Sequence, residues 1–199
     1  MMTSRRIAAN VLVSVSAGAT AVLTVANPAG AHTSRGPGGV LDGILHPLTG
    51  PDHLLAMLAV GVVAVLAAPR GRVWVVPAAF LGGMIAGGAA GIAGLPLPGA
   101  EHLIIASVFV LGLAIALAVQ GSADWLIAAL IVAGVAHGRA HGAEAPTSAH
   151  PLAYVAGFVV ATASLHLAGV GVGVTIKNRR TARVGIGAAT IAAGALLLA

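Results

Sequence analysis

Cysteine and charge are what this 199-residue chain lacks: it has no cysteine, and only 8% of its residues are charged. The absence of cysteine excludes disulfides, thiolate metal sites and cysteine nucleophiles. The shortage of charge excludes a soluble domain, in which about 25% of residues are charged. Since 58% of the residues are hydrophobic and the mean hydropathy is +1.02, the sequence predicts a polytopic membrane protein.

Three common catalytic motifs are missing as well. The chain has no HExxH of zinc proteases, no GxSxG of serine hydrolases and no GxxxxGK[ST] phosphate loop. We therefore expect that the protein is not an enzyme. If it transports a substrate, we expect a gradient or another subunit to drive transport, because this chain has no motif for ATP hydrolysis.

The first 31 residues have the pattern of a secretory signal peptide. Two arginines precede an apolar stretch over residues 7–26, and Ala29-Gly30-Ala31 has the form of a cleavage site. Cleavage there would make His32 the first residue of the mature chain, where its amine and imidazole together form a metal chelate. The alternative interpretation is an uncleaved first transmembrane helix.

Six further apolar segments each approach the roughly 20 residues that a bilayer requires. They cover residues 40–68, 73–95, 101–120, 124–143, 150–175 and 182–199. The breaks between them are short, so neighbouring segments must run antiparallel. The sequence predicts an all-α bundle of six transmembrane helices, with residues 32–199 forming a single domain after the signal peptide of residues 1–31.

The basic residues predict the orientation. If the mature N-terminus lies outside, the outer side holds only Arg35 and Arg139, and the inner loops hold Arg70, Arg72, Lys177, Arg179, Arg180 and Arg183. This excess agrees with the positive-inside rule, and it predicts a protein of the bacterial plasma membrane with both termini outside. It also explains the net charge of +5 by topology, so we expect lipid rather than nucleic acid as a partner.

Glycine is abundant, at 28 residues. The stretch GGMIAGGAAGIAG, residues 82–94, places Gly83, Gly87 and Gly91 on one face of a helix. Small residues at this spacing let two helices approach closely within a membrane. We interpret this face as a packing surface within the bundle, with a homo-oligomer interface as the alternative.

The stretch HPLTGPDHLLAM, residues 46–57, places polar groups at the start of an apolar run. Gly50-Pro51 predicts a break in the first helix, because proline removes a backbone donor and clashes with the preceding turn. Asp52 and His53 would then lie in the first turn of a second half-helix, where the helix dipole favours a carboxylate, and His46 would lie before the break. Transporters form ion sites at discontinuous helices of this kind.

A second polar stretch, HGRAHGAE, covers residues 137–144. The spacing places His137, His141 and Glu144 on one helical face. Two imidazoles and a carboxylate suit nickel, cobalt, zinc or copper(II), whereas copper(I) prefers softer ligands. A histidine pair at this spacing is often structural in a soluble helix. Inside a membrane a functional site is favoured, because ionisable groups there are costly to bury.

Two more polar residues have weaker signals. His166 lies in the middle of the fifth segment with Thr162 and Ser164 nearby, and it either bonds to a neighbouring hydroxyl or belongs to the ion pathway. Glu101 begins the third segment, either as a ligand at the entrance or as a helix cap.

At these residues the chain resembles a known family. HPLTGPDHLLAMLAVG, residues 46–61, and AHGRAHGAE, residues 136–144, are similar to the motifs of the HupE/UreJ proteins, and the resemblance covers essentially the whole chain. It implies a nickel or cobalt permease associated with hydrogenases and ureases. It also implies roles for His46, Asp52 and His53 in the first span and for the 137–144 stretch in the fourth, and it places family polar positions at Glu101 and His166.

We therefore predict a secondary transporter that takes Ni²⁺ (or Co²⁺) into the cytoplasm, with the metal as cargo and no permanent cofactor. The predicted metal ligands are His32, His46, Asp52, His53, Glu101, His137, His141, Glu144 and His166. The alternative is a membrane-bound accessory protein that holds metal for hydrogenase or urease maturation without transporting it. The sequence leaves open whether the chain forms a homo-oligomer or contacts nickel-enzyme maturation proteins.

Overall fold

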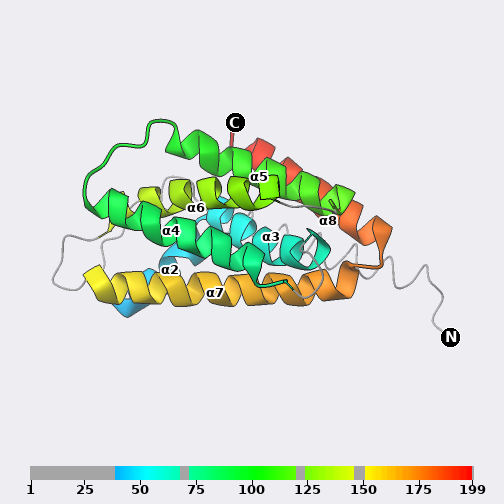
Figure 1. The fold of residues 1–199 in the computed structure, drawn as a ribbon, viewed down its shortest axis with the longest axis horizontal. Coiled ribbons are helices and arrows are strands. Elements are labelled where there is room, and N and C mark those ends of the chain that lie inside the picture. Colours follow the sequence, from blue (N-terminus) through cyan, green and yellow to red (C-terminus); the bar gives the residue numbers. More distant parts are fainter. Residues whose placement is uncertain (1–38, 68–71, 120–123, 146–150, 199) are drawn as a thin grey trace.

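The computed structural model describes residues 39–67, 72–119, 124–145 and 151–198. Within these ranges every regular element is an α-helix, so the predicted all-α class is confirmed. The helices are α2 (Val40–Thr49), α3 (Pro51–Ala67), α4 (Val75–Ile92), α5 (Ala100–Leu117), α6 (Asp124–Glu144), α7 (Pro151–Ile176) and α8 (Arg180–Leu196). They form one elongated bundle with α3 at its centre (Figure 1). The predicted signal peptide and His32 lie outside the described residues.

The first predicted span is broken where the sequence indicated. The α2 helix ends at Thr49, α3 begins at Pro51, and the two helices are bent by 88° relative to each other. Proline fits the first position of α3 because a first-turn residue has no helical acceptor for its N–H. The Thr49 hydroxyl donates to the carbonyl of His46 at 2.8 Å, which satisfies one of the carbonyls left without a partner at the end of α2.

The number of membrane spans is smaller than predicted by hydropathy. By length and composition, four of the described helices could each cross a membrane, namely α4, α5, α6 and α7, and the bent pair of α2 and α3 makes a fifth candidate. The α8 helix has 17 residues, or about 25 Å at 1.5 Å per residue, which is short of the hydrocarbon thickness of about 30 Å. Several apolar helices therefore identify a membrane protein, while six complete spans are not confirmed.

Glycine contacts join α4 to α6. A Cβ atom added at Gly83, Gly87 or Gly91 of α4 would collide with the backbone of α6. The reverse is true of three glycines of α6, which face the backbone of α4: Gly134, Gly138 and Gly142. The two helices thus touch backbone to backbone, as small residues permit in a membrane. The interpretation of the glycine face at residues 82–94 as a packing surface within the bundle is confirmed.

The same kind of contact forms two other units. Gly61 of α3 packs on the backbone of α7 at His166, and Gly169 of α7 packs on α3 at Leu58. Glycines at 43 and 157 join α2 to α7 in the same way, and glycines at 112 and 187 join α5 to α8. The bundle is therefore made of three closely packed units: α4 with α6, α7 with α2 and α3, and α5 with α8.

One half of the bundle interior is entirely apolar. We call this region the apolar floor and define it by five buried side chains near the C-terminal end of α3 and the N-terminal ends of α4 and α6: Val63, Leu66, Val76, Leu126 and Leu130. The other half, around the bend between α2 and α3, contains most of the buried polar side chains. The fold therefore separates a polar end from an apolar end.

Candidate metal centre

Four of the predicted metal ligands lie side by side at the bend. His46 comes from α2, His53 from α3, and His137 and His141 from α6. The ring centroids of His46 and His141 are 4.6 Å apart, those of His141 and His53 are 4.3 Å apart, and those of His53 and His137 are 5.1 Å apart. We call this set the histidine row. All four side chains are at most 9% exposed, so the two sequence stretches meet in the interior.

Asp52 holds the ring of His53. Its Oδ1 atom lies 2.7 Å from Nδ1 of His53. Because a carboxylate only accepts hydrogen bonds, Nδ1 is the protonated nitrogen, and the lone pair for a metal is on Nε2. A carboxylate behind a histidine is the usual arrangement in metal sites, where it fixes the tautomer and orients the ring.

His137 has the same tautomer for a different reason. Its Nδ1 donates to the carbonyl of Ala133, one turn earlier in α6, at 2.8 Å. The Nε2 atoms of His137 and His53 are both buried and have no hydrogen-bond partner among the described residues. A buried polar atom without a partner costs about 1–3 kcal/mol and calls for an explanation. A metal ion is one partner that would satisfy both nitrogens.

The row is not a closed metal cage in this conformation. Among the described residues, no three histidine, aspartate or glutamate side chains surround a common point. The rings instead contact one another edge to face. Simultaneous binding of one ion by three of these side chains would therefore require some of the rings to turn.

Aromatic side chains enclose the row, and sequence reasoning missed them. Tyr154 of α7 contacts His46, Phe158 of α7 contacts His141, and Phe80 of α4 contacts His137, with centroid distances of 5.8, 4.3 and 5.2 Å. The chain has only one tyrosine and three phenylalanines, and three of these four residues surround the row. Their scarcity is a signal that could have drawn attention to them.

The remaining predicted ligands are not part of the row. His166 is buried in α7, where its ring contacts Phe80 at 5.6 Å. Glu101 is exposed in the first turn of α5, and no contact with the row is found. Glu144 is the last residue of α6, but its side chain, like the whole of His32, lies outside the described part of the structure.

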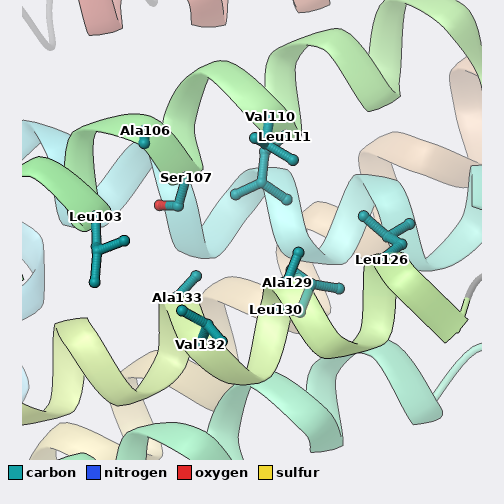
Figure 2. A pocket seen from close by; sticks show the side chains of 10 residues that line it. All are labelled: Leu103, Ala106, Ser107, Val110, Leu111, Leu126, Ala129, Leu130, Val132 and Ala133. Atoms are coloured by element: carbon teal, nitrogen blue, oxygen red, sulfur yellow. The ribbon is translucent and has the colours of Figure 1, made fainter.

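Two cavities of about 230 Å³ each lie elsewhere along α6. The first, between α5 and α6, is lined by apolar side chains and Ser107 (Figure 2). The hydroxyl of Ser107 donates to the carbonyl of Ile104 at 2.6 Å, so this cavity offers no strong metal ligand. The second lies between α4, α6 and α7 and reaches His141, Tyr154 and Phe158. Of the two, only the second touches the histidine row.

Comparison with known proteins agrees with the arrangement of motifs. The family model described as HupE / UreJ protein matches residues 20–197. Protein HupE of Rhizobium leguminosarum bv. viciae is 40% identical over 181 residues, which are 90% of this chain and 91% of that protein. No solved structure matches. The family match therefore covers every helix from α2 to α8.

Proposed function

Because the chain belongs to the HupE/UreJ family, whose members are membrane proteins related to nickel or cobalt handling for hydrogenase and urease, we propose that it is a permease. Its cargo is Ni²⁺ (or Co²⁺), which it carries into the cytoplasm across the plasma membrane. The observation that supports this proposal best is the histidine row, which draws ligands from α2, α3 and α6.

The chemistry of the row suits a borderline divalent metal. Neutral imidazole is a good ligand for nickel and cobalt, and the Nε2 atoms of His53 and His137 are buried without a partner among the described residues. Asp52 adds a negative charge next to His53, which lowers the cost of bringing a cation into the membrane interior. Ionisable groups at such a depth commonly mark ion pathways.

The shape of the row favours transport over storage. A storage site holds its metal with three or more converging ligands, and no such group is found among the described residues. Neighbouring rings at 4.3 to 5.1 Å instead offer successive sites. Conduction requires binding that is weak enough, or shared between enough sites, to let the ion leave. In the proposed pathway Glu144 and Glu101 receive the ion at the outer face, and His32 adds a ligand there if the signal peptide is cleaved.

Reconstitution separates this proposal from the accessory alternative. We expect liposomes containing only this protein to take up Ni²⁺ in a saturable manner, measured with a fluorescent indicator trapped inside. Empty liposomes are the control for leakage. If the purified protein binds Ni²⁺ in detergent but its liposomes take up no more than empty ones, the protein is an accessory metal binder and not a permease.

Replacing Asp52 by asparagine should weaken Ni²⁺ binding without removing a histidine. The amide has no charge and is a poorer acceptor for Nδ1 of His53, so the ring loses its fixed orientation. We expect the affinity for Ni²⁺, measured by titration calorimetry in detergent, to fall by about 10- to 100-fold. Asp124→Asn, the same change at an exposed position, is the matched control. Equal affinities for the two variants would contradict an orienting role for Asp52.

A further inference from the structure

We propose that His166 is a second station for the transported ion, separated from the histidine row by the ring of Phe80. This inference rests on the proposed function, because it assigns the step that follows binding at the row. Four features of the interior support it: the unsatisfied nitrogen of His166, the position of Phe80, the contact between Met57 and Thr162, and the apolar floor.

The first feature is the buried nitrogen of His166. The side chain is 2% exposed, and its Nε2 atom has no hydrogen-bond partner among the described residues. The sequence suggested that a nearby hydroxyl could bond to it. However, Ser164 donates to the carbonyl of Val160 at 2.8 Å, and Thr162 donates to the sulfur of Met57 at 3.4 Å. The purely structural explanation for this histidine therefore loses both of its proposed partners.

The second feature is the position of Phe80. Its fully buried ring contacts His137 on one side, at 5.2 Å, and His166 on the other, at 5.6 Å. His166 lies eight residues beyond Phe158 on α7, which is about 12 Å along the helix axis. Since Phe158 contacts the row at His141, His166 lies deeper in the bundle than the row.

The third feature is a continuous line of side chains between the two sites. Met57 follows His53 by one turn of α3, and Thr162 precedes His166 by one turn of α7. The two side chains touch, and both are completely buried. The facing sides of α3 and α7 thus lead from His53 to His166, with a thioether and a hydroxyl halfway.

The fourth feature is what lies beyond His166. Toward the apolar floor, the buried side chains described for α3, α4, α6 and α7 include no further histidine, aspartate or glutamate. An ion that leaves the row in this direction meets one last nitrogen ligand before a wholly hydrophobic region. A single imidazole binds more weakly than several together, so this station suits release rather than retention.

The test is to separate binding from movement in variants of His166. We expect His166→Ala and His166→Gln to bind Ni²⁺ in detergent within about threefold of wild type, because the row remains intact. In liposomes their maximal uptake rate should fall at least about tenfold, with an unchanged half-saturating Ni²⁺ concentration. His166→Cys, which supplies a different nickel ligand, should recover part of the rate. Ser164→Ala, at an exposed position of the same helix, is the control and should behave as wild type.

Two results would overturn the inference while leaving the permease proposal in place. One is wild-type uptake by both His166→Ala and His166→Gln, which would remove His166 from the pathway. The other is a loss of Ni²⁺ affinity of about tenfold or more in all three variants, which would make His166 part of the first site or of the fold. If wild-type liposomes take up no Ni²⁺ at all, the proposed function fails and this inference fails with it.

Discussion

Nickel uptake by liposomes containing the His53→Ala protein should be at least about 100-fold slower than wild-type uptake, the upper end of what second-shell changes alone produce. His53 is the central member of the row, since its ring contacts both His141 and His137. It is also the residue through which Asp52 acts. Removing the imidazole therefore interrupts the row and leaves a buried carboxylate without its partner.

The experiment compares initial rates of radiolabelled Ni²⁺ uptake at equal amounts of reconstituted protein. His137→Ala, which removes the other unsatisfied Nε2 atom, should show a loss of similar size. His102→Ala is the matched control, because His102 is exposed on α5. Wild-type uptake by both His53→Ala and His137→Ala would show that the row is not the transport site.

The second large effect is expected on stability, from a single methyl group. In Gly138→Ala, the new Cβ atom would collide with the carbonyl of Met84 and crowd the backbone nitrogen of Gly88 on α4. Both obstacles are backbone, so neither can rotate away, and α4 and α6 must separate. Overpacking of this kind costs about 1–3 kcal/mol or more. We expect a fall of about 5–10 °C in the melting temperature.

Thermal unfolding in detergent, followed by circular dichroism, measures this effect. Gly82→Ala is the matched control, because a Cβ atom at Gly82 meets nothing within 4 Å. It should melt at or slightly above the wild-type temperature, since alanine is the better helix former. If the two alanine variants melt at the same temperature, the glycine contact between α4 and α6 does not contribute to stability as described.

The broken helix could be predicted from the sequence because its cause is local. Proline at position 51 forbids the preceding helical hydrogen bond wherever it stands, and the structure has the break there. The glycine face of α4 was predictable for a similar reason, since its spacing alone defines a surface for another helix. Neither conclusion depended on knowing how distant segments are placed.

The arrangement of the site was not predictable to the same extent. The sequence indicated that residues 46–53 and 137–144 share a site, but not the order in which their rings alternate. That order depends on how far α6 is shifted along α3, which is set by packing on other helices. The isolation of His166 was equally hidden, because it depends on which acceptors the hydroxyls of Thr162 and Ser164 choose.

Hydropathy also could not fix the last helix. Residues 182–199 are apolar enough to suggest a span, yet the helix runs from Arg180 to Leu196 and starts with basic residues. Its contacts are mainly with α5, so its length is not adjusted to surround the site. The count of complete spans is therefore a property of helix ends, which composition defines poorly.

The glycine contacts have a mechanical consequence. They fasten α4 to α6 as one rigid body and α7 to the α2–α3 pair as another. His137 and His141 belong to the first body, whereas His46 and His53 belong to the second. Direct contacts of α4 with α3 and α7 are far sparser than those within each body. A small rocking of one body against the other would thus change the spacing between the ring nitrogens while leaving every glycine contact intact.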